Sequence, residues 1–102
     1  MKRQVLWSRA ALDDLKAQVS FIARENPAAA RRIGQRIRTT GDDFAQFATG
    51  HPGRVADTYE KSVRGLPYVL AYAFERRGGA EAVVVLRVIH SARDWREGEW
   101  PG

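Results

Sequence analysis

The chain has 102 residues, 44% of them hydrophobic, which is enough for one hydrophobic core and too little for two. Its 17 Lys and Arg outnumber 12 Asp and Glu, and the formal net charge of +5 favours encounters with nucleic acid, ribosomes or acidic proteins. The absence of cysteine excludes disulfides and thiolate metal sites. We therefore expect one folded domain over residues 1–102.

The N-terminal segment does not have the pattern of a signal peptide or a membrane span. Lys2 and Arg3 supply the usual positive charge, but Arg9, Asp13 and Asp14 interrupt any apolar stretch. We therefore expect a cytoplasmic protein without a membrane-spanning segment.

Residues 4–7 are a short apolar run with β-type side chains, and they predict a strand. Ser8 follows as an N-cap, so a helix should begin directly after the strand. Asp13 and Asp14 are expected in the first helical turn, where the helix dipole favours negative charge. The apolar face of this helix is predicted to consist of Leu12, Leu15, Val19 and Ile22.

Asn26 and Pro27 predict the start of a second helix, as its cap and first residue. The spacing predicts an apolar side made of Ala30, Ile33, Ile37, Phe44 and Phe47. Gly34 and Gly41 lie on or beside that side and would permit close helix contact. The connection between the two helices is short, so they should form an antiparallel hairpin.

Residues 49–53 are expected to be a loop, and three strands should follow at 59–64, 68–75 and 82–90. Tight connections at 65–67 and 77–79 predict an antiparallel meander. Residues 83–89 are apolar on both faces apart from Arg87, as in a central strand covered by the hairpin and by a partner. The fold class is α+β: a strand, a helical hairpin and a three-stranded meander, with the helices on one face of the sheet.

The sequence contains no phosphate-binding loop, dinucleotide fingerprint, HExxH motif or serine nucleophile elbow. The two histidines, His51 and His90, are far apart and have no metal-ligand spacing. We expect neither a cofactor nor a bound metal. Each histidine is better explained as a turn or strand-end residue than as a catalytic group.

Basic residues in the second half of the chain are the remaining candidates for chemistry. An RNA-cleaving site could use basic groups to hold phosphate, with His90 or a tyrosine as acid or base; the candidates are Lys61, Arg64, Arg87 and Arg93. The alternative for each is solvated surface charge. Tyr68 and Tyr72 alternate with apolar residues, so they should belong to the core with their hydroxyls at its margin.

Two parts of the chain resemble a known family. Residues 11–15, 21–23 and 25–30 resemble the opening helical hairpin of ParE-type toxins. Residues 65–72 and 86–95 are similar to the most recognisable region of that family. The resemblance implies the β-α-α-β-β-β order predicted above. It also implies a ParD-like antitoxin that wraps the toxin and forms a hetero-oligomer with it.

The ParE/RelE family has two branches, and the resemblance implies different targets for them. The ParE branch inhibits DNA gyrase, whereas the RelE branch cleaves messenger RNA on the ribosome. Lys61 and Arg93 match RelE-type positions, but Tyr68-Val69 replaces an expected arginine and no tyrosine follows Tyr72. We therefore expect a binding inhibitor of DNA gyrase, with a RelE-type messenger RNA endonuclease as the alternative.

The two functions would use different residues. A nuclease would use Lys61, Arg64, His90 and Arg93. A gyrase inhibitor is expected to bind its target through Arg87, Arg93, Trp95 and Trp100, because exposed Trp and Arg are favoured interface anchors. The alternative for both tryptophans is that they fold back over the end of the core.

Overall fold

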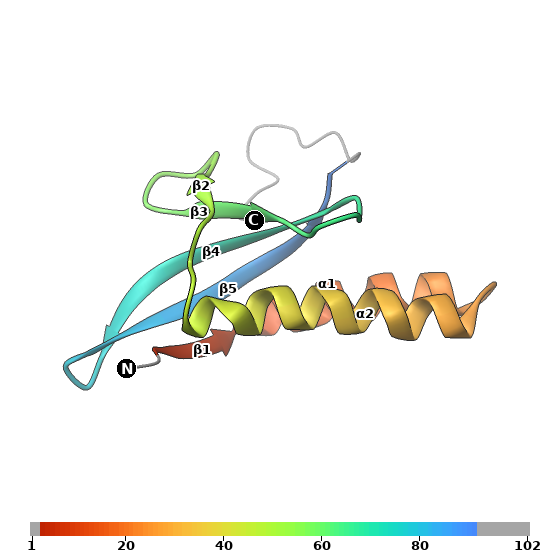
Figure 1. Ribbon diagram of the computed structural model, residues 1–102, viewed down its shortest axis with the longest axis horizontal. Helices are drawn as coiled ribbons and strands as arrows, with labels where there is room; N and C mark the ends of the chain where they lie inside the picture. The colour runs from red at the N-terminus through yellow and green to blue at the C-terminus, as the bar shows by residue number, and fades with distance from the viewer. Residues whose placement is uncertain (1–2, 92–102) are drawn as a thin grey trace.

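The computed structural model describes residues 3–91 and consists of two helices packed on one face of a five-stranded mixed sheet (Figure 1). The helices are α1 (Arg9–Ala23) and α2 (Pro27–Asp42), followed by the 3-10 helix η1 (Asp43–Ala45). The strands are β1 (Gln4–Trp7), β2 (His51–Pro52), β3 (Tyr59–Ser62), β4 (Tyr68–Arg77) and β5 (Ala80–His90). This confirms the predicted fold class. None of the described helices has the length and apolarity needed to cross a membrane.

The caps of both helices are the predicted ones. The Ser8 hydroxyl accepts a hydrogen bond from the Ala11 amide at 3.0 Å, and the Asn26 side chain accepts one from the Ala29 amide at 3.0 Å. Each bond satisfies one of the amides that a helix N-terminus leaves without an intrahelical partner. Pro27 occupies the first turn of α2. Local sequence therefore determines where each helix begins.

Two expectations for α1 were wrong. Leu12 is 39% exposed, and Ala11 is the fully buried residue instead. Asp13 and Asp14 lie beyond the first turn, which contains no acidic residue, because α1 begins at Arg9. These carboxylates therefore do not act through the helix dipole, and Asp14 has a different partner.

The C-terminal end of α2 also differs from the prediction. The α-helix ends at Asp42 and continues as η1, so Phe44 is buried while Phe47 is 67% exposed. Thr and Asp are weak helix formers, and a 3-10 turn has a tighter period that moves later residues off the apolar face. Phe47 is consequently a surface residue.

The two glycines of α2 each permit a close contact. A Cβ at Gly34 would lie 3.0 Å from Val19 Cγ2, so this position serves the predicted helix–helix contact. A Cβ at Gly41 would overlap the indole of Trp7, which lies on β1. The indole is also held by a hydrogen bond from Trp7 Nε1 to Asp42 Oδ1 at 3.2 Å. Gly41 thus positions α2 against the first strand.

The sheet has the strand order β1-β5-β4-β3-β2 (Figure 1). β3, β4 and β5 form the predicted antiparallel meander, and β1 adds to β5 in parallel, which makes β5 a central strand. Gly78 and Gly79 have φ of +58° and +82°, as a tight two-residue turn requires. β4 therefore ends at Arg77 and β5 begins at Ala80, so both strands are longer at this turn than predicted. The expected loop at 49–53 contains the short edge strand β2, which pairs with β3.

The main core lies between the helices and the sheet. Tyr72 is fully buried at its centre, and its ring centroid lies 4.3 Å from that of Phe44. Its hydroxyl accepts a hydrogen bond from the Gly50 amide at 2.9 Å, which confirms the predicted position of a tyrosine hydroxyl at the core margin. A smaller cluster on the opposite face comprises Ala71 and Ile89, with Val55, Val69 and Leu86 packed against them.

Glu60 is a buried carboxylate on β3, with 5% of its surface exposed. Its Oε2 accepts hydrogen bonds from the Arg54 amide at 3.0 Å and from Arg54 Nε at 2.9 Å. Burial alone would raise the pKa of Glu60, but the hydrogen bonds and charge of Arg54 outweigh it and lower the pKa below 4.5. A carboxylate with a lowered pKa stabilises the fold above its unfolded pKa, and this stabilisation is lost as the pH falls through the folded pKa.

Glu60→Gln is therefore expected to flatten the acid side of the stability profile. Thermal melts from about pH 3 to pH 7 should show a smaller fall in melting temperature for the variant than for the wild type. Glu75→Gln is the matched control, because the Glu75 side chain is 43% exposed and makes one ion pair, at 3.5 Å, with Arg77. An unchanged acid-side slope in Glu60→Gln would contradict this interpretation of the buried pair.

Candidate functional site

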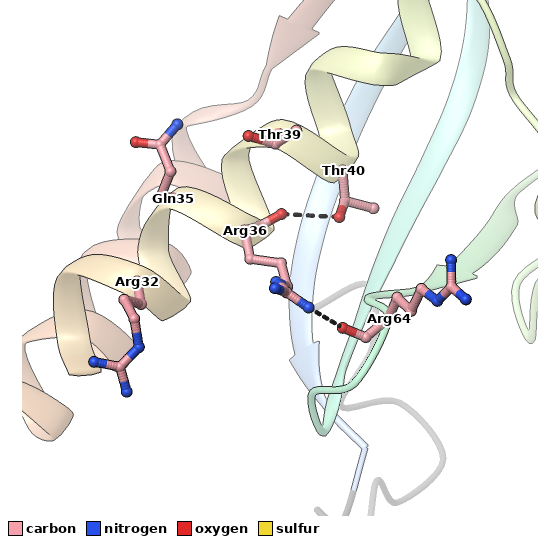
Figure 2. Close-up of a pocket in the computed structure, with 6 residues that line it drawn as sticks. All are labelled: Arg32, Gln35, Arg36, Thr39, Thr40 and Arg64. Carbon is pink, nitrogen blue, oxygen red and sulfur yellow. Dashed lines mark hydrogen bonds between the residues drawn. The ribbon is translucent and has the colours of Figure 1, made fainter.

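A basic groove runs along α2 from Arg32 to Thr40, beside the connection between β3 and β4 (Figure 2). It is open to solvent, has a volume of about 480 Å³, and is lined by Arg32, Gln35, Arg36, Thr39, Thr40 and Arg64. Arg36 crosses the groove, and its Nη1 donates a hydrogen bond to the Arg64 carbonyl at 3.2 Å. The Thr40 hydroxyl donates to the Arg36 carbonyl at 2.8 Å, as Thr often does to the preceding turn.

The basic groove continues at both ends. Towards β3 it opens into a second hollow of about 480 Å³, which shares Thr40 and Arg64 and adds Phe44, Phe47 and Lys61 among its lining residues. Towards the start of α2 it reaches Ile33 and Leu66. Two of the predicted nuclease residues, Lys61 and Arg64, thus lie on one surface, together with the two arginines of α2.

The charge of the basic groove is not neutralised within residues 3–91. The ion pairs of these residues involve other cations, and no carboxylate among them lies within 4.0 Å of Arg32, Arg36, Lys61 or Arg64. Asp43 is the one acidic residue among the described groove residues. An anionic ligand is therefore the chemistry that this surface suits best.

His90 lies elsewhere on the sheet. It ends β5 opposite Tyr68, and the two ring centroids are 5.2 Å apart in an edge-to-face arrangement. β4 separates β5 from β3, so the backbones that carry His90 and Lys61 are about 10 Å apart at the usual strand spacing. The structure does not place His90 on the basic groove. Arg93, the fourth nuclease candidate, lies outside the described residues.

A nuclease site on the basic groove would need a general base, and the two buried tyrosines do not supply one. Burial raises the pKa of Tyr68 and of Tyr72 above 10, so both phenols stay protonated at neutral pH. The Tyr68 hydroxyl donates to Gln18 of α1 at 3.2 Å, as a structural hydrogen bond. His51 is exposed on β2, at the far edge of the sheet. Within residues 3–91, no three metal-binding side chains come together.

Arg87 makes a partly buried ion pair with Asp14. Arg87 Nε and Nη2 donate to the two carboxylate oxygens at 2.7 and 3.0 Å, and each side chain is 18% exposed. The hydrogen bonds that Arg87 donates to Asp14 raise the pKa of Arg87, so the guanidinium remains charged. The Val88 amide also donates to Asp14, at 3.0 Å. One carboxylate thus ties α1 to β5.

This ion pair lies at an irregularity in β5. Tyr72 pairs with Val85 and Ala71 with Arg87, so Leu86 is an extra residue that bulges from the strand. The pairing with β1 ends at Val85, and Ser8 binds the Leu86 carbonyl through its hydroxyl at 2.9 Å. β1 does not extend as far as Val88, so the Val88 amide donates its hydrogen bond to Asp14 and not to a β1 carbonyl. Of the other predicted target-binding residues, Arg93, Trp95 and Trp100 lie outside the described residues.

Sequence reasoning missed the helical side of the basic groove. Arg32 and Arg36 are four residues apart, and this spacing places them on one face of α2. That signal was available from the sequence. The exposure of Phe47 was not, because it depends on where the α-helix gives way to η1.

Comparisons with known proteins agree over most of the chain. Residues 5–95 match the family model described as the ParE toxin of the type II toxin–antitoxin system parDE. The chain is 32% identical to the protein Y4kP of Sinorhizobium fredii over 95 residues, covering 92% of this chain and 94% of that protein. It is 35% identical to toxin RelE2 of Caulobacter vibrioides over 92 residues, covering 88% and 97%.

Among solved structures, the chain is similar to one from the chromosomal ParDE system of P. aeruginosa, with a TM-score of 0.75. The similarity covers 87% of this chain and 96% of that one at 20% identity. It supports the fold.

Proposed function

Because the chain belongs to the ParE toxin family of type II toxin–antitoxin systems, we propose that it inhibits DNA gyrase and is neutralised by a ParD-like antitoxin. The toxin acts in the cytoplasm, and the two proteins form a hetero-oligomer. Inhibition takes place by binding, without a chemical step of the toxin's own.

The observation that carries this proposal is the separation of His90 from Lys61 and Arg64. General acid–base catalysis requires a titratable group within hydrogen-bond reach of the reacting atoms, close to the groups that hold the phosphate. β4 lies between His90 and the basic groove, and both buried tyrosines stay protonated. A toxin that acts by binding alone needs no acid–base group close to its phosphate-holding residues.

The proposed target contacts are Arg87, Arg93, Trp95 and Trp100, the residues predicted from the sequence. Arg87 is held by Asp14, so its guanidinium is fixed in position near the end of β5, and the remaining contact residues follow it in the chain. The antitoxin is proposed to cover apolar surface on the helical hairpin and the sheet. Phe21, which is 68% exposed on α1, is one such residue.

The test is a gyrase supercoiling assay on relaxed plasmid. Purified toxin is expected to suppress supercoiling or to trap cleaved DNA, and an equimolar amount of the antitoxin encoded beside it should restore activity. Arg93→Ala should weaken inhibition by about tenfold or more while leaving the melting temperature nearly unchanged, as loss of an interface anchor does. Full supercoiling at saturating toxin would refute gyrase inhibition.

A ribosome-dependent nuclease of the RelE type is the second candidate. The observations that favour it are the 35% identity to a relative named toxin RelE2 and the joint placement of Lys61 and Arg64 on the basic groove. If this function is correct, induced cells should show rapid cleavage of ribosome-bound messages with normal supercoiling. His90→Ala should then slow cleavage by about two orders of magnitude or more, as loss of an acid–base group does.

A further inference from the structure

We propose that the basic groove binds a short single strand of nucleic acid, with phosphates on Arg32, Arg36, Arg64 and Lys61 and a base stacked on Phe47. None of these residues is among the proposed gyrase contacts Arg87, Arg93, Trp95 and Trp100. The proposal goes beyond gyrase inhibition and does not depend on it.

The groove combines positive charge with hydrogen-bond donors suited to phosphate. Arg32 and Arg36 are one helical turn apart, about 6 Å along α2, and Arg64 and Lys61 extend the charged row towards β3. Arg36 uses one of its five N–H donors on the Arg64 carbonyl. Gln35, Thr39 and Thr40 add amide and hydroxyl groups, which commonly bind phosphate oxygens beside Arg and Lys.

An aromatic ring lies at the β3 end of the groove. Phe47 is 67% exposed and lines the same hollow as Lys61 and Arg64. Proteins that bind single strands combine a cationic groove with aromatic rings on which bases stack. A duplex keeps its base faces stacked inside the helix. A run of Asp and Glu residues would satisfy the cations but offer no ring to stack on Phe47, whereas a single strand supplies both charge and rings, so the single strand is the better fit.

The experiment measures fluorescence anisotropy of a labelled oligothymidine of about twelve nucleotides with the full-length chain and no gyrase. The double variant Arg32→Ala/Arg36→Ala is expected to bind about tenfold more weakly, and its log–log salt slope should fall by about 1.4, since each neutralised phosphate contributes about 0.7. Arg31→Ala/Arg76→Ala is the matched control. It removes the same charge from exposed residues outside the groove and should change affinity by less than about threefold.

Phe47 is tested in the same assay. Phe47→Ala should weaken binding of oligothymidine by about fivefold or more, as loss of base stacking does, while Phe47→Tyr retains affinity. Phe21→Ala is the control for removing an exposed ring, because Phe21 is 68% exposed on α1 outside the groove. Oligouridine is measured in parallel, and preferential binding of either oligomer assigns the strand as DNA or RNA.

Three results would overturn the proposal. If the groove variant and the control variant lose affinity equally, the binding depends on overall charge and not on the groove. Equally tight binding of duplex DNA, insensitive to Phe47→Ala, would exclude base stacking. Groove-dependent binding of polyglutamate without binding of oligothymidine would assign the surface to an acidic protein. Because gyrase is absent from the assay, none of these results bears on gyrase inhibition, and failure of the supercoiling test leaves this one intact.

Discussion

Tyr72→Ala is expected to lower the free energy of unfolding by about 4 kcal/mol, within the range for removing a large buried aromatic side chain. Tyr72 is fully buried. Its ring centroid lies 5.7 Å from that of Tyr59, in a stacked arrangement, and 4.3 Å from that of Phe44. Small domains have about 5–15 kcal/mol of stability in total, so this single change removes a large share of it. The melting temperature should fall by about 15–30 °C, measured by circular dichroism.

Tyr72→Phe separates packing from hydrogen bonding at the same position. It keeps the ring and removes the oxygen that accepts the Gly50 amide at 2.9 Å. The expected loss is about 1–2 kcal/mol, the usual cost of leaving one partly buried amide unpaired. If Tyr72→Phe proves as damaging as Tyr72→Ala, the ring packing does not dominate and the interpretation of the core is wrong.

Asp14→Ala is expected to cost about 2–4 kcal/mol, because it leaves the Arg87 guanidinium without its carboxylate and the Val88 amide without its acceptor. Both side chains of the pair are 18% exposed, so water replaces the lost partner only in part. Urea unfolding should show a lower midpoint with an unchanged slope.

Asp13→Ala is the matched control on the adjacent residue of α1. The Asp13 side chain is 67% exposed and pairs with Arg9 at 3.5 Å, a contact of the kind that contributes little to stability. Its substitution should change stability by less than about 0.5 kcal/mol. Equal effects of the two substitutions would show that helix charge, and not the Asp14–Arg87 pair, is what matters.

Features encoded by neighbouring residues could be predicted from the sequence. The Ser8 and Asn26 caps, the hairpin and the antiparallel meander depend on residues a few positions apart. The parallel pairing of β1 with β5 could not be predicted, because nothing near Gln4–Trp7 identifies a distant partner strand. The two residues of β2, one of them proline, are too few to give a strand pattern.

The same division applies to the candidate site. Lys61 and Arg64 were singled out as basic residues on or beside one strand, and they do lie on one surface. Arg87 was visible as a charge in an apolar strand, but its partner Asp14 is 73 positions away. The basic groove forms only when α2 packs beside the β3–β4 connection. The sequence alone therefore could not predict that the two sides of the groove lie next to each other.

The parallel pairing of β1 with β5 has a consequence for the synthesis of the chain. Ser8 binds the Leu86 carbonyl 78 positions later, so the first strand has no strand to pair with until nearly all of the described sequence has been translated. Contacts between such distant residues slow folding, because a long loop must close, at a cost in entropy, before the contacts can form and stabilise the chain. The helical hairpin can form early on the ribosome, whereas the sheet must wait for β5. Nascent chains of this toxin therefore stay incomplete, and their core-forming strands stay open to a partner, until translation reaches the last strand.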